Sequence, residues 1–517
     1  MLNLYPFVLL ALCLSTRTTA SVGPDVKLRI TNEDIAPDGF QRPAVLAGGT
    51  FPGPTIAGKK GDTFNINVIN RLHDTRMDVA TTIHWHGLDQ HKFNAFDGVS
   101  FVTQCPITPD DNFKYKFNIP EQAGTFWYHS HLSNQYCDGL RGALIVRDPR
   151  DPHAHLYDVD DDSTIITLAD WYHYLSHNAP PIPAFNSTLI NGVGRWAGGP
   201  AVELAVVKVR PGKKYRFRLI SVSCDPNFTF SIDKHILTII EVDGNNVQPL
   251  DVDQIQIFAG QRYSFVLKAN QPVNNYWIRA LPNRPGDKTD DGVNSAILRY
   301  VGAPKVDPTT AQTGGKLPLV ETNLHPLVPS PVPGKPVPGG ADININLQTT
   351  INDLRNAFLV NNYSFKDPTV PVLLQILSGA KKPQELLPAG SIYNLTRGAS
   401  VELTIPAGVI GGPHPVHLHG HAFHVVRSAG NNSYNFDNPV LRDVVDIGDT
   451  GDNVTIRFKA DNPGPWFFHC HIDWHLTAGF AVVFAEDVPD VPTTDVTSAA
   501  WKELCPEYEQ FVASGSN

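Results

Sequence analysis

The side chains best suited to chemistry in this sequence form four His-x-His pairs. The pairs are His84 and His86, His129 and His131, His417 and His419, and His469 and His471. Residues i and i+2 of a β-strand point to the same face, so each pair can direct two imidazoles at one point. Eight converging imidazoles exceed the four ligands that a zinc ion typically takes. The pairs therefore predict a cluster of several metal ions.

A second metal site is predicted directly behind this cluster. Cys470 separates His469 from His471, so on a strand its thiol faces the opposite way. Imidazole and thiolate suit copper, and two histidines with one cysteine form the ligand set of a blue-copper electron-transfer site. His475 lies a turn or loop downstream of Cys470, and His414 lies three residues before His417 and can leave the cluster face, so these two histidines can complete that set.

The axial position of this second site can also be predicted. Blue-copper sites often have a weak axial methionine. The only methionines are Met1 and Met77, and neither lies near Cys470 in the sequence. We therefore expect an apolar residue, Phe480, in the axial position. Without a thioether donor, the site favours Cu(I) and acts as a strong one-electron oxidant.

The elements that position these residues are predicted to be β-strands. Runs such as 63–69, 215–220 and 454–458 alternate with a period of two, and long runs with a helical period are scarce. The chain has 43 Pro and 40 Gly but only 18% charged residues, which is typical of many short strands joined by turns. The pattern predicts an all-β protein of sandwiches or barrels.

Three units of about domain size are predicted, because 517 residues are too many for one small core. Segment 147–162 is rich in Asp, Pro and His, and segment 326–340 is rich in Pro and Gly. Both compositions are typical of linkers. Residues 464–471 are similar to 123–131, so the first and third units are predicted to be copies of one fold. Each of these units carries two His-x-His pairs. The cluster is therefore expected at their interface, with the middle unit as a spacer and as one wall of a pocket.

The net charge of the chain and its N-terminal segment indicate which partners the protein binds and where it is located. A net charge of -10 argues against nucleic acid. Residues 1–20 are similar to a secretory signal, with an apolar run at 7–14 and small residues at 18–20, although no Lys or Arg precedes the run. No other stretch approaches the roughly 18 apolar residues of a membrane span. We expect a soluble, secreted protein.

The cysteines and the glycosylation sequons agree with an oxidising compartment. With Cys13 in the signal and Cys470 on a metal, four cysteines remain, and they can form two disulfides in any of three pairings. These four are Cys105, Cys137, Cys224 and Cys505. Six Asn-x-Ser/Thr sequons predict a glycoprotein. They begin at Asn186, Asn227, Asn362, Asn394, Asn431 and Asn453.

The motifs around the histidines resemble, in chain order, the four copper motifs of multicopper oxidases. They are His-Trp-His-Gly (84–87), Trp-Tyr-His-Ser-His (127–131), His-Pro-Val-His-Leu-His-Gly-His (414–421) and His-Cys-His-Ile-Asp-Trp-His-Leu (469–476). The resemblance spans nearly the whole mature chain and is greatest to secreted fungal laccases, although Val416 stands where Phe is common. It implies three cupredoxin-like Greek-key domains, at 21–150, 151–320 and 321–517, and four copper ions per chain.

The resemblance also implies a role for each ligand. His414, Cys470 and His475 would bind the type 1 copper, and His84 and His417 would bind the type 2 copper. The type 3 pair would have His86, His129 and His471 on one ion and His131, His419 and His469 on the other. The implied disulfides are Cys105–Cys505 and Cys137–Cys224.

The implied activity is that of a laccase. A phenol or aromatic amine gives one electron to the type 1 copper, and Cys470 passes it through the covalently adjoining His469 and His471 to the type 3 coppers. After four transfers, the cluster reduces O2 to two waters. Asp97 resembles an acid that lies near the cluster, and Asp225 resembles a substrate-binding carboxylate. Both also stand in ordinary turn sequences, Asp-Gly and Asp-Pro.

Two alternatives remain open. One is another multicopper oxidase, such as a ferroxidase or an ascorbate oxidase. The other is a copper-binding protein without turnover, which the complete two-histidine, one-cysteine site disfavours because storage needs no thiolate relay. We expect small phenolic or aromatic amine substrates and O2 as partners, no nucleic acid, no membrane and a monomer. His421 and His424 are predicted to be structural. Four other histidines are predicted to lie at the surface or behind a metal ligand and not to bind a fifth metal: His153, His155, His173 and His177.

Overall fold

The computed structural model describes residues 20–515 apart from 285–287, 353–355, 381, 389 and 409–411. Of the predicted secretory signal, residues 1–20, only Ala20 is among the described residues. Strands dominate the chain, as its alternating runs predict. Among the described residues, no helix is long and apolar enough to cross a membrane.

The N-terminal unit packs two four-stranded sheets against each other, with the orders β2-β1-β4-β6 and β3-β8-β7-β5. Alternation places Phe64, Ile66 and Val68 of β4 in the core. The strands are β1 Asp25–Ile35, β2 Arg42–Ala47, β3 Gly53–Lys59, β4 Thr63–Arg71, β5 Ile83–His86, β6 Asn112–Asn118, β7 Gly124–Ser130 and β8 Arg141–Arg147.

The middle unit packs a six-stranded sheet, β10-β9-β12-β17-β14-β15, on a five-stranded sheet, β11-β19-β18-β13-β16. The strands are β9 Ile165–Trp171, β10 Ser187–Ile190, β11 Val206–Val209, β12 Lys214–Ser221, β13 Phe228–Ile232, β14 Leu237–Val242, β15 Asn245–Val252, β16 Ile255–Ile257, β17 Arg262–Lys268, β18 Asn275–Pro282 and β19 Ser295–Tyr300.

The C-terminal unit has two five-stranded sheets, β20-β24-β29-β26-β27 and β23-β31-β30-β25-β28, and the hairpin β21-β22. Its strands are β20 Ile343–Asn346, β21 Thr349–Asn352, β22 Ala357–Val360, β23 Ile392–Leu395, β24 Ser400–Pro406, β25 Pro415–Leu418, β26 Phe423–Arg427, β27 Leu441–Arg442, β28 Val444–Asp446, β29 Asn453–Lys459, β30 Gly464–Cys470 and β31 Ala481–Glu486. Its helices are α1 Val372–Leu377, α2 Pro383–Leu386, α3 Asp473–Thr477, α4 Val491–Thr494 and α5 Ala499–Ala513.

The first and third units repeat one sheet, as the similarity of 123–131 to 464–471 predicts. In the first unit β3 pairs in parallel with β8, and β8, β7 and β5 follow in antiparallel order. In the third unit β23 pairs in parallel with β31, and β31, β30 and β25 follow in antiparallel order. All four His-x-His motifs therefore begin on equivalent pairs of strands.

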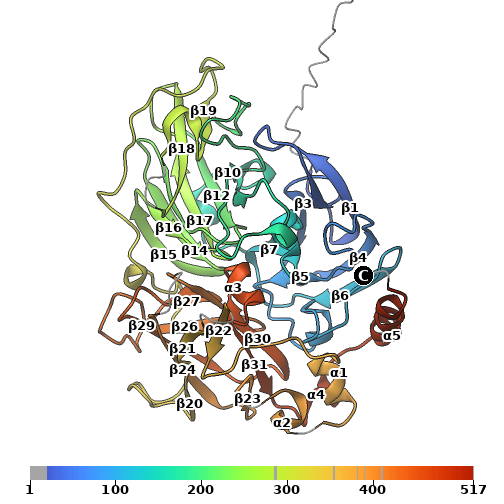
Figure 1. Cartoon of the computed structure of the whole chain (residues 1–517). Coiled ribbons are helices and arrows are strands. Elements are labelled where there is room, and N and C mark those ends of the chain that lie inside the picture. The colour runs from blue at the N-terminus through green and yellow to red at the C-terminus, as the bar shows by residue number, and fades with distance from the viewer. Residues whose placement is uncertain are drawn as a thin grey trace, which may run out of the picture.

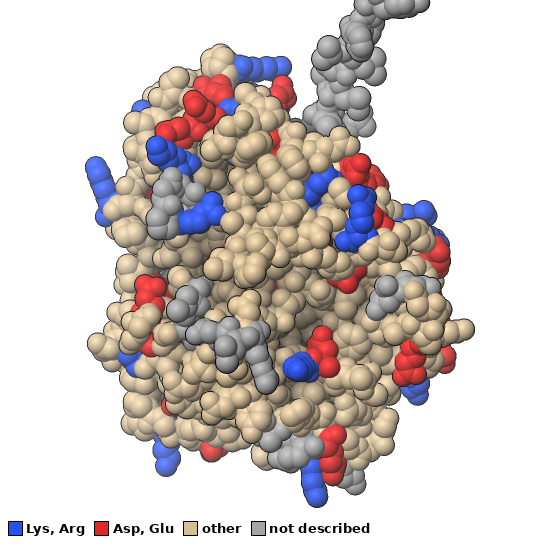
Figure 2. Space-filling view, in the orientation of Figure 1, with Lys and Arg blue, Asp and Glu red and all other residues tan. Residues whose placement is uncertain are grey.

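The three units meet around the centre of the molecule (Figure 1). The blue and cyan N-terminal unit lies beside the green middle unit, and the orange and red C-terminal unit lies below both, with α3 near their junction. The helix α5 crosses to the outer edge of the N-terminal unit, beside β6. Acidic and basic side chains are interspersed over the face in Figure 2, where the large central area is mostly uncharged.

One face of β12 is polar yet buried between units. Arg216 and Arg218 are both buried in the structure. Arg218 Nη1 donates to Thr125 Oγ1 at 2.9 Å, and Arg216 pairs with Glu241, whose Oε1 accepts the Thr125 N–H at 2.9 Å. An alternating strand commonly has one solvated face. Here the alternation at 215–220 reflects a face that packs on the N-terminal unit.

Candidate metal centre

Two pairs of neighbouring strands carry the cluster histidines. On β5 and β7, His84 lies opposite His129, and on β25 and β30, His417 lies opposite His469. Because side chains alternate along a strand, the second histidine of each motif points to the same side as the first. All eight imidazoles are buried at the junction of the first and third units.

The eight rings converge into groups whose nitrogens lie within 4.8 Å of one another. One group is His86, His129 and His471, and another is His131, His419 and His469. His84 and His417 also lie together, in a group that shares His86. The separations are 3.1 Å between His86 Nδ1 and His471 Nε2, and 3.0 Å between the Nε2 atoms of His419 and His469.

The outer nitrogens of most rings are held by polar groups of the chain. Four Nδ1 atoms donate to backbone carbonyls at 2.8 Å: His84 to Asp97, His129 to Ser130, His417 to Asp443 and His469 to Cys470. The inner Nε2 atoms of four rings have no hydrogen-bond partner among the described residues. These rings are His84, His129, His131 and His417. In His84, His129 and His417 the outer nitrogen is held and the inner one is left without a partner, as metal-binding imidazoles require.

The electrostatics of the cluster agree with this fit. Burial, with the neighbouring rings, lowers the pKa of His129, His131, His417 and His419 well below the ordinary value. Burial lowers the pKa of His469 to about 3. The rings are therefore neutral and present lone pairs to the centre, so a cation is the group that they can bind.

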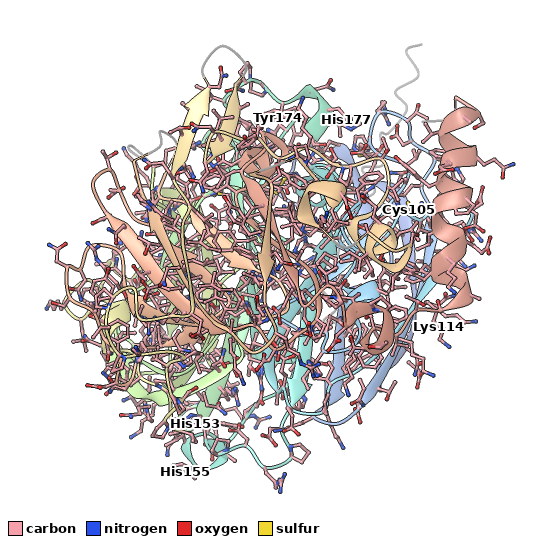
Figure 3. The ribbon with its side chains drawn as sticks, turned by 90° about the horizontal axis from the view of Figure 1, so that it is seen from below. Cys105, Lys114, His153, His155, Tyr174 and His177 are labelled. Atoms are coloured by element: carbon pink, nitrogen blue, oxygen red, sulfur yellow. A yellow bond between two sulfur atoms is a disulfide. The ribbon has the colours of Figure 1, made fainter. Side chains whose placement is uncertain are left out.

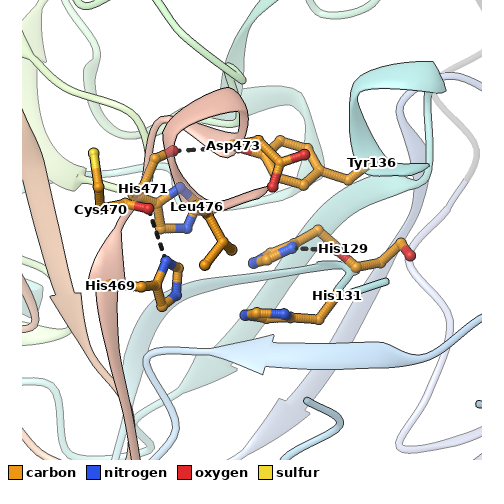
Figure 4. A pocket seen from close by; sticks show the side chains of 9 residues that line it. His129, His131, Tyr136, His469, Cys470, His471, Asp473 and Leu476 are labelled. Carbon is orange, nitrogen blue, oxygen red and sulfur yellow. Dashed lines mark hydrogen bonds between the residues drawn. The ribbon is translucent and has the colours of Figure 1, made fainter. Parts of the chain in front are cut away.

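Cys470 forms a second group with His414 and His475, as the sequence predicts. Cys470 Sγ lies 3.8 Å from His414 Nδ1 and 3.7 Å from His475 Nδ1, and the two nitrogens are 3.1 Å apart. Figure 4 shows the Cys470 sulfur on the side away from the rings of His129 and His131. Burial raises the pKa of the Cys470 thiol, so a thiolate here needs a compensating cation.

Aromatic rings cover this second group. The Phe480 ring lies 5.4 Å from the His414 ring and is stacked at 5.3 Å on Phe358, which lies 4.5 Å from the His475 ring. Phe480 is buried, whereas His475 is half-buried. Met77 is buried in the core of the N-terminal unit. The Phe480 side chain is therefore adjacent to the group, and His475 is its most accessible member.

Asp97 is buried beside the cluster. Its Oδ2 accepts from His419 Nδ1 at 2.9 Å, and its Oδ1 lies 3.3 Å from His84 Nδ1. It follows the short 3-10 helix η1, Asn94–Phe96. One carboxylate thus contacts rings that come from the first and the third unit.

Asp225 is half-buried in the segment that faces α3. The backbone carbonyl of Cys224 accepts the Asp473 N–H at 2.9 Å, and the Asp225 N–H donates to Asp170 Oδ2 at 3.1 Å. Burial, and then the negative charge of Asp170, raise the pKa of Asp225 to about 7. Asp225 is thus poised to exchange a proton near neutral pH.

Comparisons with known proteins decide the family. Multicopper oxidase family models match residues 29–151, 162–303 and 365–490. The chain is 58% identical over 505 residues to a laccase of Phlebia radiata and 58% identical over 508 residues to laccase-2 of Trametes villosa. Each comparison covers 97% of both chains. The chain belongs to the multicopper oxidase family.

Solved structures of multicopper oxidases share its fold. One is Fet3p, described as a multicopper oxidase that functions in iron import, with a TM-score of 0.81 and 27% identity over 94% of this chain and 95% of Fet3p. Another is a laccase from Botrytis aclada, with a TM-score of 0.80 and 32% identity over 94% of this chain and 92% of that one. The expected fold of three cupredoxin-like domains is confirmed. As a multicopper oxidase, the protein binds copper.

Two buried carboxylates of this multicopper oxidase were not predicted. Asp443 Oδ1 lies 3.2 Å from His86 Nε2, and burial raises the Asp443 pKa to about 6 against the opposing charge of Arg262. No motif surrounds Asp443 in the sequence. Asp473 lies inside the last copper motif, and an acid within a ligand motif is a signal that could have identified it.

Asp473 lines a narrow hollow that reaches the cluster (Figure 4). Its Oδ2 accepts from Asn134 Nδ2 at 3.0 Å, and burial raises its pKa to about 8. The other lining residues are His129, Ser130, His131, Tyr136, His469, Cys470, His471 and Leu476. Asp473 thus places a carboxyl group of raised pKa in the same hollow as four of the cluster histidines.

Both disulfides implied by the family resemblance are present in this multicopper oxidase. Cys105 is bonded to Cys505, and Cys137 is bonded to Cys224. Of the six sequons, three asparagines are exposed and three are half-buried. The exposed ones are Asn186, Asn362 and Asn394, and the half-buried ones are Asn227, Asn431 and Asn453. Glycosylation at each remains a prediction.

The other histidines lie apart from the candidate metal groups. His153 and His155 lie at one edge of the molecule and His177 at the opposite edge (Figure 3). His173, His177 and His421 pair with the carboxylates of Asp38, Asp78 and Glu486. His424 Nε2 lies 3.1 Å from Ser330 Oγ. The contacts of His421 and His424 support the structural roles predicted for these two residues.

Proposed function

We propose that this protein is a laccase that oxidises phenols and aromatic amines by one electron and reduces O2 to water. The proposal rests on one observation: Cys470 connects the two groups of metal-binding side chains. Its sulfur belongs to the group of His414 and His475, and its bonded neighbours His469 and His471 belong to the cluster. The identity of 58% to fungal laccases over nearly the whole chain supports the same activity.

The proposed ligands follow the groups in the structure. The type 1 copper has His414, Cys470 and His475, with Phe480 as an axial non-ligand. The type 2 copper has His84 and His417. The type 3 coppers have His86, His129 and His471 on one ion, and His131, His419 and His469 on the other. Four copper ions per chain would be bound. Copper would accept single electrons at the Cys470 site and would pass four electrons to O2 at the cluster.

The surrounding residues have three proposed tasks. Asp225 accepts the phenolic proton as the substrate loses its electron at the His475 edge. Asp97 orients His84 and His419, and its carboxylate lies beside the cluster, where the reduction of O2 consumes protons. The peptide between Cys470 and its neighbouring histidines provides a covalent path between the two donor groups. We further propose a secreted, glycosylated monomer with domains at 21–150, 151–320 and 321–517.

A ferroxidase is the second candidate, because the fold is also that of Fet3p. Oxygen uptake by the copper-loaded protein should be measured with a phenol, with Fe(II) and with ascorbate. We expect the phenol to give the highest kcat/KM. A preference for Fe(II) would identify a ferroxidase, and copper binding without oxygen uptake would identify a non-catalytic copper protein.

A further inference from the structure

We propose that Arg262 of the middle unit is a positioning residue for the histidine cluster and acts through Asp443 on the ring of His86. The inference rests on the proposed function, in which His86 is a copper ligand. No ligand in that proposal comes from the middle unit. Arg262 would give this unit a task at the cluster beyond that of a spacer.

The contacts of Arg262 join all three units. Arg262 is fully buried at the start of β17. Its Nη1 and Nη2 donate to Asp443 Oδ1 at 2.5 Å and Oδ2 at 2.7 Å, and its Nε donates to the Thr125 carbonyl at 2.9 Å. The planar guanidinium suits such two-point recognition of a carboxylate. Asp443 is therefore fixed in position and in orientation.

This fixed carboxylate determines which nitrogen of His86 can bind a metal. The Arg262 guanidinium only donates hydrogen bonds and favours the ionised form of Asp443, in which both carboxylate oxygens act as acceptors. His86 Nε2, 3.2 Å from Asp443 Oδ1, must then carry the proton. The lone pair is left on His86 Nδ1, the atom that faces His471 Nε2 at 3.1 Å. A carboxylate that accepts from the outer nitrogen of a metal-binding imidazole orients the ring in this way.

The backbone of Asp443 also positions a second histidine ring, that of His417. The Asp443 carbonyl accepts from His417 Nδ1 at 2.8 Å, which leaves His417 Nε2 for the cluster. Gly87 and Gly260 make room for the arrangement. Each has a positive φ, and a Cβ at Gly87 would lie 2.9 Å from Asp443 Oδ2, while one at Gly260 would lie 2.9 Å from His471 Cδ2. A side chain at either glycine would therefore push against Asp443 or His471.

A matched control lies in the same unit. Arg279 Nε and Nη2 donate to both oxygens of buried Asp233 at 2.9 Å, and neither residue belongs to a candidate metal group. Arg262→Gln and Arg279→Gln therefore each remove a buried two-point clamp. Both should lower the unfolding temperature to a similar extent, because each leaves a buried carboxylate unpaired.

The two variants should differ in copper binding. We expect Arg262→Gln to weaken cluster copper by about 10–100-fold, as the loss of an outer partner of a metal ligand does. If the type 3 ion beside His86 is lost, the other type 3 copper has no second copper to couple with. An additional EPR signal should then appear. Arg279→Gln should keep the wild-type copper content and EPR spectrum. Metal analysis, EPR spectroscopy and thermal unfolding measure these outcomes.

Milder variants keep the test decisive if Arg262→Gln does not fold. Arg262→Lys keeps the charge but not the two-point contact, and Asp443→Asn can donate to His86 and so permits the other tautomer. Both should weaken cluster copper while they keep the fold. Wild-type copper binding and EPR in these variants would overturn the inference. A wild-type protein that binds no copper would instead contradict the proposed function.

Discussion

Single residues decide how the two donor groups are connected, and Cys470 is the most important of them. Cys470→Ser replaces a soft thiolate by a hard hydroxyl of similar size, so the charge transfer that colours a blue-copper site is lost. We expect no blue colour and a fall in phenol oxidation of at least about 100-fold, with copper retained in the histidine cluster. Visible absorption, metal analysis and oxygen uptake measure this. A blue, active variant would refute the ligand assignment.

Phe480 is the residue that we propose for the axial position. Phe480→Met would add a weak thioether ligand and stabilise the oxidised state, and each tenfold of relative stabilisation lowers a one-electron potential by about 59 mV. We expect a lower potential in a redox titration. Phe484→Met is the control, because Phe484 is equally buried but packs on Phe458 and Phe468. Equal potentials in Phe480→Met and wild type would place another residue in the axial position.

Asp225 is expected to separate two classes of substrate. Asp225→Asn keeps the shape and removes the base, so kcat/KM for phenols should fall about 100-fold or more, as general-base assistance implies. A non-phenolic donor has no proton to lose and should be affected much less. Steady-state kinetics with one donor of each class test this. Equal losses with both would show that Asp225 has a structural role only.

The pH dependence of this effect follows from the raised pKa of Asp225. Its carboxylate forms as the pH rises through about 7. The advantage of the wild type over Asp225→Asn should therefore be small at acidic pH and grow across neutral pH. The optimum of the variant should move upward, toward the phenolate, because a phenol has a pKa of about 10. A constant ratio of the two enzymes across this range would contradict general-base action by Asp225.

Among the elements, α5 is the one whose position depends most on a covalent link. Cys505 ties it to Cys105, 400 residues away in the sequence, and Trp501 Nε1 donates to the Thr103 carbonyl at 3.0 Å. The disulfide restricts a long loop of the unfolded chain. Replacing both cysteines by Ala should lower the free energy of unfolding by roughly 2–4 kcal/mol. The copper content should stay unchanged, since no proposed ligand lies on α5. An unaltered midpoint in thermal unfolding would mean that packing alone holds α5.

For the molecule as a whole, copper and tertiary structure should stabilise each other. The proposed cluster ligands come from the first and the third unit, so only the native arrangement offers the complete site. A ligand present at about 1,000 times its Kd stabilises the native state by about 4 kcal/mol. Removing copper with a chelator should lower the unfolding temperature, and copper addition should restore it. Unchanged unfolding after complete removal would argue against an inter-unit cluster.

The sequence alone predicted the two groups of donor residues and the class of fold. A period of two makes both histidines of each pair face one side and makes Cys470 face the other, and both consequences are local to a strand. The similarity of 123–131 to 464–471 likewise predicted that β7 and β30 are equivalent. Chemistry that depends on residues i, i+1 and i+2 needs no knowledge of distant contacts.

Tertiary structure alone decided what surrounds the ligands. Arg262, Asp443 and His86 are brought together from three units, and nothing in the spacing of these residues indicates it. The buried polar face of β12 and the position of α5 across the N-terminal unit were likewise not apparent from local patterns. An alternating strand looks the same whether its polar face meets water or another unit. Only the fold, by removing water from these faces, turns ordinary charged residues into partners that fix the metal-binding rings.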